Sequence, residues 1–189
     1  MVKLILRHIA TDIKIYLIDS KAAELTSYQG RENLIYIGNE DELIEFSEEI
    51  EDEIAQREGL LELEKSKNPT IIPRQFYQQV DPMVVMIEDV DNVVEIIKGG
   101  KVATLEKILM SLETYNITII GTSVGNKLKG YDALSKYMRD CLNGVVLGHP
   151  SEQTVLQVPY MRTSVVPLGI GYIYQKGELL KVKIPGEMV

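Results

Sequence analysis

Residues 83–91 read Met-Val-Val-Met-Ile-Glu-Asp-Val-Asp, and this stretch decides the expected fold. Five apolar residues follow Pro82 and end in the adjacent carboxylates Glu88 and Asp89. A continuous apolar run bounded by a breaker is typical of a strand that is buried on both faces in a parallel sheet. Ligands of such sheets bind in the crevice at the carboxyl ends of the strands. The stretch therefore predicts a buried strand that carries two carboxylates to a ligand-binding edge.

The Glu88-Asp89 pair matches an arrangement of nucleotide hydrolases, in which one carboxylate holds Mg²⁺ and its neighbour orients the attacking water. Adjacent residues of a strand point to opposite faces, so both can serve one site only where the strand end twists. The alternative interpretation is a pair of solvated acids that ends a buried strand. The usual partner motif, a G-x-x-x-x-G-K-[ST] phosphate loop, is not found in the sequence.

Composition limits the classes of function. The 189 residues are 45% hydrophobic and 25% charged, which fits one globular domain with a sizeable core. The net charge of −8 argues against a nucleic-acid surface, because phosphate contacts need clustered Lys and Arg. We expect neither a membrane span nor a secretion leader, since no long apolar run is present. The single cysteine, Cys141, excludes an internal disulfide and suits a reducing cytosol, and with only two histidines it argues against a zinc site.

Strand-like and helix-like segments alternate along the chain, which predicts an α/β fold with a parallel sheet flanked by helices. We expect a single domain over residues 1–189. The expected strands span residues 13–18, 34–37, 83–87, 117–120, 145–147, 171–174 and 179–184, the last two joined through Lys176-Gly177. One expected helix begins after Asn39, and three others span residues 92–97, 103–115 and 131–142.

The helix after Asn39 has the clearest local signals. Glu42 stands three residues after Asn39, as in a capping box. Its other faces are dense in acid, with Arg57 the only base between Glu40 and Glu64. Two interpretations remain open for these faces: a solvated surface or an acidic docking surface. One apolar stripe at helical spacing consists of Leu43, Phe46, Ile50, Ile54 and Leu61.

Three glycine-containing segments can be compared with known ligand-binding loops. Residues 121–127 (GTSVGNK) follow a strand, but they are one residue short of a phosphate loop and Asn separates Gly from Lys. Thr122 and Ser123 could instead present hydroxyl groups to a phosphate or water at the strand end. Residues 168–171 (LGIG) are too short for a dinucleotide fingerprint, and glycine there indicates close approach of the backbone. Gly99-Gly100-Lys101 follows a helix and is interpreted as a helix break.

Four stretches, taken in order, resemble the FtsK/SpoIIIE-type ATPases. Residues 15–21 (IYLIDSK), with Glu24-Leu25 and residues 28–30, are similar to the family's YLIDxKxxEL strand and turn. Residues 84–91 resemble its Walker B strand, and residues 117–123 resemble the next strand, which normally ends in Ala-Thr-Gln. Residues 168–171 resemble the LGxGDMLY segment beside the nucleotide base. The likeness runs from about Lys3 onward, and within the family it is greatest to the C-terminal ATPase module of the type VII secretion coupling protein EssC/EccC.

Departures from the family pattern are as informative as the likeness. Glu88 stands where the family has its magnesium-binding Asp, and Asp89 stands where it has its catalytic Glu. A carboxylate moved by one methylene shifts its oxygens by about 1 Å, and misplacement on that scale can cost ~10²-fold in rate. Ala-Thr-Gln becomes Gly121-Thr122-Ser123, and the Asp of LGxGDMLY becomes Tyr172. The resemblance therefore implies a degenerate ATPase with little hydrolysis of its own.

The resemblance also implies a RecA-like P-loop NTPase fold that lacks its first strand and Walker A loop. That loop would lie just upstream of residues 2–4 in a larger bacterial cell-membrane protein, of which residues 1–189 would be a cytoplasmic module. The strand feeding the loop is central in the family's sheet. Its loss would leave unpaired strand edges, which invite self-association into a homo-oligomer or rearrangement.

The implied role is that of a module in a bacterial type VII secretion motor, which binds secreted helical-hairpin substrates and regulates neighbouring ATPase modules. In the intact module Glu88 would hold the Mg²⁺ of Mg-ATP and Asp89 would orient water. Thr122 and Ser123 would sense the γ-phosphate, and Gly169 and Gly171 would flank the base. We expect no tight binding of nucleotide to this chain. Two alternatives remain: an active translocation ATPase once a phosphate loop is present, and a self-contained acid-dependent phosphohydrolase.

Overall fold

The computed structural model describes residues 2–19, 25–100, 102, 104–124, 127–128, 130–159 and 165–184. Parts of three segments discussed above lie outside the described residues: 20–24, Lys101, and 125–126. The chain divides into two compact units, Met1–Thr122 and Ser123–Val189, and each is described by itself. The expectation of one module over residues 1–189 stays a prediction, since two compact units can belong to one module.

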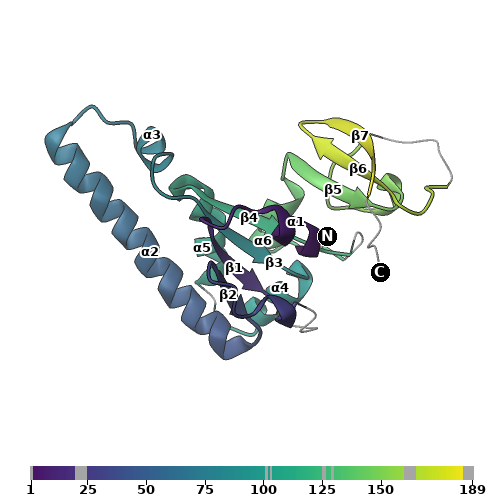
Figure 1. The fold of residues 1–189 in the computed structure, drawn as a ribbon, viewed down its shortest axis with the longest axis horizontal. Helices are drawn as coiled ribbons and strands as arrows, with labels where there is room; N and C mark the ends of the chain where they lie inside the picture. Colours follow the sequence, from purple (N-terminus) through teal and green to yellow (C-terminus); the bar gives the residue numbers. More distant parts are fainter. Residues whose placement is uncertain are drawn as a thin grey trace. The chain divides into compact units, whose positions relative to one another are not determined.

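The first unit is built on a parallel sheet of four strands (Figure 1). The strand order is β2 (Leu34–Ile37), β1 (Lys14–Ile18), β3 (Met83–Ile87) and β4 (Ile117–Gly121). All three strand pairs are parallel. Every residue of β3 is buried, as its uninterrupted apolar sequence predicts. The predicted α/β class with a parallel sheet is therefore confirmed.

Helices account for most of the remaining first unit. The expected helix over 103–115 is observed as a short α-helix followed by a 3₁₀ helix, with Ala103 outside the described residues. The α-helices are α1 (Val2–His8), α2 (Glu40–Lys67), α3 (Pro73–Tyr77), α4 (Val90–Lys98) and α5 (Leu105–Ser111). The 3₁₀ helices are η1 (Thr26–Tyr28) and η2 (Leu112–Tyr115).

The two faces of the parallel sheet pack against different helices. Ile15 and Leu17 of β1 belong to the buried cluster that also contains residues of α1. Tyr16 points to the opposite face, where its ring lies 5.0 Å from the ring of Phe46 in α2. Successive strand residues alternate between faces, so β1 contributes to both cores. The result is a sheet held between α1 on one side and α2 on the other.

The start of α2 confirms the predicted cap with one change. The Asn39 side chain accepts a hydrogen bond from the Glu42 backbone N at 2.9 Å. The Glu42 carboxylate accepts one from the Gly38 backbone N at 2.6 Å, one residue earlier than in the usual capping box. Of the predicted apolar stripe, Ile54 is half-buried and the other four residues are buried.

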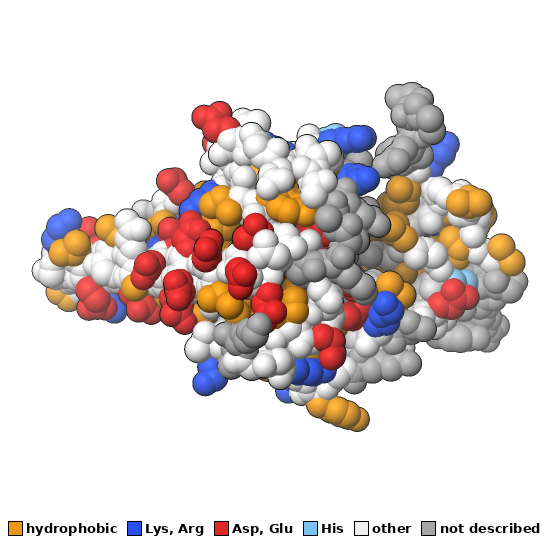
Figure 2. Space-filling view, turned by 90° about the horizontal axis from the view of Figure 1, so that it is seen from below, with side chains coloured by type: hydrophobic (Ala, Val, Ile, Leu, Met, Phe, Trp, Pro, Cys, Tyr) orange, Lys and Arg blue, Asp and Glu red, His pale blue; other side chains and the backbone are white. Residues whose placement is uncertain are grey.

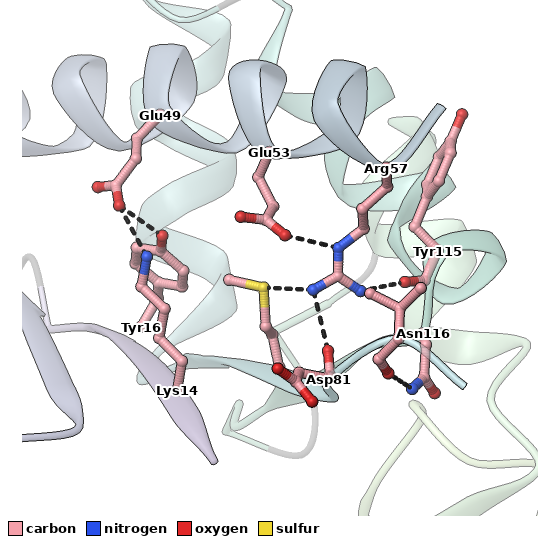
Figure 3. A network of polar contacts seen from close by, with 10 residues as sticks. Lys14, Tyr16, Glu49, Glu53, Arg57, Asp81, Tyr115 and Asn116 are labelled. Carbon is pink, nitrogen blue, oxygen red and sulfur yellow. Dashed lines mark hydrogen bonds and ion pairs between the residues drawn. The ribbon is translucent and has the colours of Figure 1, made fainter. Parts of the chain in front are cut away.

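Arg57 differs from the acids around it on α2, because only 2% of it is exposed. Its guanidinium group donates to the backbone carbonyls of Tyr115 and Asp81, which lie just before β4 and β3 (Figure 3). It also donates to the Glu53 carboxylate at 2.6 Å and contacts Met83 Sδ at 2.8 Å. Arg57 therefore fastens α2 to the amino edge of the sheet.

The second unit contains an antiparallel sheet in the order β5-β6-β7. The predicted hairpin through Lys176-Gly177 is confirmed, and both turn residues have the positive φ that a two-residue hairpin turn requires. The parallel order does not extend to these strands, because a two-residue turn can join only antiparallel strands. The elements are α6 (Ala133–Arg139), β5 (Asn143–Leu147), η3 (Pro150–Glu152), β6 (Ile170–Gln175) and β7 (Glu178–Lys183).

Candidate functional site at the carboxyl edge of the parallel sheet

Three predicted site residues meet at the carboxyl ends of β3 and β4. The Thr122 hydroxyl donates to Glu88 Oε2 at 2.9 Å and accepts from the Asp89 backbone N at 3.1 Å. The backbone continues the pairing, because Thr122 N donates to Ile87 O at 2.9 Å and Val90 N donates to Thr122 O at 2.8 Å. The parallel order of the strands thus brings together Glu88, Asp89 and Thr122, which are 33 to 34 residues apart in sequence.

Asp89 adopts a left-handed backbone conformation, with φ 61° and ψ 70°. Left-handed conformations cost most L-residues roughly 1–2 kcal/mol, and Asp tolerates them better than most. The Asp89 backbone N donates to the Thr122 hydroxyl oxygen, so Asp89 meets Thr122 through its backbone. Unusual backbone conformations of this kind concentrate at functional sites.

Asp19 lies at the same edge, directly after β1, and is 1% exposed. Its Oδ2 accepts from the Leu25 backbone N and from the Tyr36 hydroxyl, both at 2.9 Å. Continuing the strand register by one residue places Asp19, Glu88 and Thr122 in one row across the sheet. Sequence reasoning noted the strand end but assigned Asp19 no role. The sequence feature that could have identified Asp19 is its place directly after the apolar residues of β1.

The environment of Asp19 changes the ionisation of its tyrosine partner. Burial raises the pKa of Tyr36 to about 12, and the hydrogen bond to Asp19 and the charge of that carboxylate add to the rise. The neutral phenol therefore remains a hydrogen-bond donor to Asp19 throughout the physiological range. This pair, with the Leu25 amide, fixes the chain on both sides of the β1 carboxyl end.

The other predicted site residues belong to the second unit. The Ser123 hydroxyl donates to the Val124 carbonyl at 3.2 Å. Gly169 has φ +78°, which favours glycine. A Cβ on Gly171 would lie 2.8 Å from Ile184 Cδ1 and 3.2 Å from Val146 O, so glycine permits close packing there. The roles of Ser123, Gly169 and Gly171 toward a nucleotide stay predictions.

The chemistry of Glu88 fits Mg²⁺ only in the company of phosphates. No group of three or more His, Cys, Asp or Glu residues within the described ranges could hold a metal ion. Mg²⁺ is usually bound by one or two carboxylates together with water and substrate phosphates, so one half-buried carboxylate suits Mg²⁺ that arrives with a nucleotide. A threonine hydroxyl carries one proton, and Thr122 gives it to Glu88. Contact with a phosphate oxygen would require Thr122 to redirect that donor.

The parallel sheet between helices, with an acid and a hydroxyl at its carboxyl edge, defines an α/β fold that is shared with solved secretion ATPase domains. The cytoplasmic domain of EssC superimposes with a TM-score of 0.74 at 20% identity, covering 97% of this chain and 36% of that one. EssC (ATPases 2 and 3) from Geobacillus thermodenitrificans gives 0.72 at 21% identity, covering 97% and 34%. Thermomonospora curvata EccC (ATPases 2 and 3), in complex with a signal sequence peptide, gives 0.58 at 16% identity, covering 97% and 33%.

Sequence comparison gives the same answer. ESX secretion system protein YukB of Bacillus subtilis is 26% identical over 189 residues, covering 98% of this chain and 12% of YukB. ESX secretion system protein EccC of G. thermodenitrificans is 23% identical over 172 residues, covering 89% and 11%. No family model matches the chain. The homologues of this chain are therefore type VII secretion ATPases of the EssC/EccC kind, which confirms the resemblance.

The chain spans about one eighth of the length of these curated relatives. Of the helices that the structure describes, none has both the length and the apolar character needed to cross a membrane.

Proposed function

We propose that this chain acts as a degenerate ATPase module of a bacterial type VII secretion motor. In this role it binds secreted helical-hairpin substrates and regulates neighbouring ATPase modules, and it hydrolyses little ATP itself. The observation that carries the proposal is the short Asp89 side chain beside the Thr122–Glu88 pair, in a chain whose homologues are type VII secretion ATPases. The module would work on the cytoplasmic side of a membrane protein, and self-association through open strand edges belongs to the same proposal.

The side chains of Glu88 and Asp89 favour slow rather than rapid hydrolysis of ATP. When bound with a nucleotide, Mg²⁺ would neutralise phosphate charge, and Glu88 is the carboxylate that would hold it. Thr122 keeps that carboxylate oriented. Asp89 would have to orient water with a side chain one methylene shorter than Glu, and an error of about 1 Å can cost ~10²-fold in rate. Glu88, Asp89 and Thr122 thus form a site better suited to nucleotide binding than to rapid turnover.

The competing function is an active ATPase that drives translocation. It is favoured by one observation: Glu88 and Thr122 are already in contact in the chain as it stands. Mg-ATP binding and turnover, measured in a form of the protein that carries a phosphate loop, separate the two functions. Turnover lost on Glu88→Ala or Asp89→Ala would establish the active motor. Binding of Mg-ATP with negligible turnover would support the degenerate module.

Substrate recognition needs its own experiment. Support comes from the T. curvata EccC structure, which contains a signal sequence peptide. Calorimetric titration of the 189-residue chain with the C-terminal tail of its secreted partner, with and without Mg-ATP, tests this part of the proposal. We expect saturable binding that does not require ATP. Failure of the tail to bind under both conditions would remove substrate recognition from the role of this chain.

A further inference from the structure

The outward side of α2 carries a row of residues that the proposed function does not use. We name this row the outer stripe; its members are three or four positions apart and therefore share one face of the helix. All of them are exposed, and they lie opposite the buried residues of α2. From the start of the helix to its end, the outer stripe consists of Glu45, Glu48, Asp52, Ala55, Gly59 and Leu63.

Gly59 is the least expected member of the outer stripe. It lies inside a 28-residue helix, where glycine costs roughly 0.5–1 kcal/mol relative to alanine. A Cβ built on Gly59 would meet no atom within 4 Å, so packing within the described structure does not require glycine at this position. Ala55, one turn earlier, is also small. Glycine permits another backbone to approach closely, and Gly59 with Ala55 offers such an approach on the exposed side of α2.

Charge and apolar surface are separated along the same face. At the amino-terminal end of the outer stripe, the acids Glu45, Glu48 and Asp52 form no ion pair with any base in the described part of the chain. Toward its end, Leu63 is 62% exposed, and Leu60 on its flank is 44% exposed. Figure 2 shows acidic side chains gathered along this helix and hydrophobic ones near its far end. The face therefore presents negative charge, then a flat small-residue section, then aliphatic side chains.

We propose that the outer stripe binds a basic amphipathic helix of another protein or protein segment. Lys and Arg side chains of that helix lie over Glu45, Glu48 and Asp52, and its aliphatic side chains cover Leu60 and Leu63. The two backbones come closest at Gly59. A helix fits better than a strand, because the spacing of the outer stripe matches the ridges and grooves by which helices pack. This proposal does not depend on the proposed ATPase role.

Charge disfavours the simplest alternative, a second copy of this chain. Two copies packed in parallel through the outer stripe would confront acids with acids, an antiparallel pair would set those acids against the aliphatic end of the other copy, and each copy has a formal net charge of −8. Like charges placed together across an interface suppress such pairing. A partner rich in Lys and Arg is favoured by the same acids.

The test uses the 189-residue chain and a fluorescent synthetic peptide of Lys, Ala and Leu arranged as an amphipathic helix, with a scrambled peptide of equal composition. We expect the amphipathic peptide to bind saturably and the scrambled one to bind much more weakly. Gly59→Gln should raise the melting temperature of the chain, since Gln is the better helix former, yet weaken peptide binding at least about tenfold. If Gly59 served only the fold of this chain, Gly59→Gln would not combine a higher melting temperature with weaker peptide binding.

Charge variants supply the matched control. Asp52→Asn on the outer stripe should weaken binding more than Glu51→Gln, which removes an exposed acid one position away from it. Equal effects of the two variants, or unchanged binding by Gly59→Gln, would overturn the proposal. So would absence of saturable binding at low salt. Concentration-dependent dimerisation of the free chain that Gly59→Gln abolishes would assign the face to a second copy instead.

Discussion

Replacement of Arg57 by methionine should remove much of the stability of the first unit. Arg57 is 2% exposed, and its guanidinium group bonds to two backbone carbonyls and to Glu53. Methionine fills similar space but leaves those acceptors without a donor. Removing one partner from a buried charged network costs about 3–5 kcal/mol. Total stabilities of domains are only about 5–15 kcal/mol, so this loss should be conspicuous.

Urea unfolding followed by far-ultraviolet circular dichroism measures this loss. With typical urea m-values of about 1–3 kcal/mol/M, the midpoint for Arg57→Met should fall by roughly 2 M. Arg57→Lys should give an intermediate loss, because a single ammonium group cannot reproduce the planar fork of donors.

Lys14→Met is the matched control, since Lys14 pairs with Glu49 through side chains that are 42% and 47% exposed. Exposed pairs of this kind contribute about 1 kcal/mol or less. An Arg57→Met loss no larger than that of Lys14→Met would refute the conclusion that Arg57 fastens α2 to the sheet.

Three further predictions concern the carboxyl edge and the second unit. Asp89→Gly should be more stable than Asp89→Ala by about 1 kcal/mol in urea unfolding, because φ is 61° there; equal stabilities would argue against backbone strain. Gly171→Ala should lower stability by about 1–3 kcal/mol through overpacking against Ile184, and Ile184→Ala in the same chain should recover part of that loss in thermal unfolding. Burial first, and then the hydrogen bond to Asp19, raises the pKa of Tyr36 from 10.0 to about 12, so the unfolded chain ionises first and the free energy of unfolding falls as the pH rises from 10 to 12. Tyr36→Phe should therefore reduce the fall in unfolding free energy measured between these pH values, and an unchanged pH dependence would contradict the assignment.

Local sequence signals predicted the elements whose residues decide their own conformation. The uninterrupted apolar run 83–87 predicted β3, and the Asn39 and Glu42 pattern predicted the start of α2. The sequence also placed Glu88 and Thr122 each at the end of a strand, but their contact depends on β3 and β4 being neighbours, which the structure supplied. For the two elements the physical cause lies within a few residues.

Other features depend on distant partners that no local pattern reveals. Arg57 reads as a surface base among acids, but its burial is decided by carbonyl groups of Asp81 and Tyr115, which lie 24 and 58 residues away. The carboxylate of Asp19 is fixed by Leu25 and Tyr36 only after the chain has turned back. Secondary-structure alternation could not show which strands form the antiparallel sheet, since strand order is a tertiary property.

The position of Arg57 along α2 has a mechanical consequence. Ten residues follow it in the helix, which corresponds to about 15 Å of rigid rod beyond the anchorage. A load applied near Leu63 would be shared by Arg57, by the buried side chain of Leu61 and by the hydrogen bond from the Tyr115 hydroxyl to Glu58. Through Arg57 it would reach the chain just before β3 and β4, and those strands end at Glu88 and Thr122. Arg57 thus joins α2 to the segments that lead into the two strands carrying the acid and the hydroxyl.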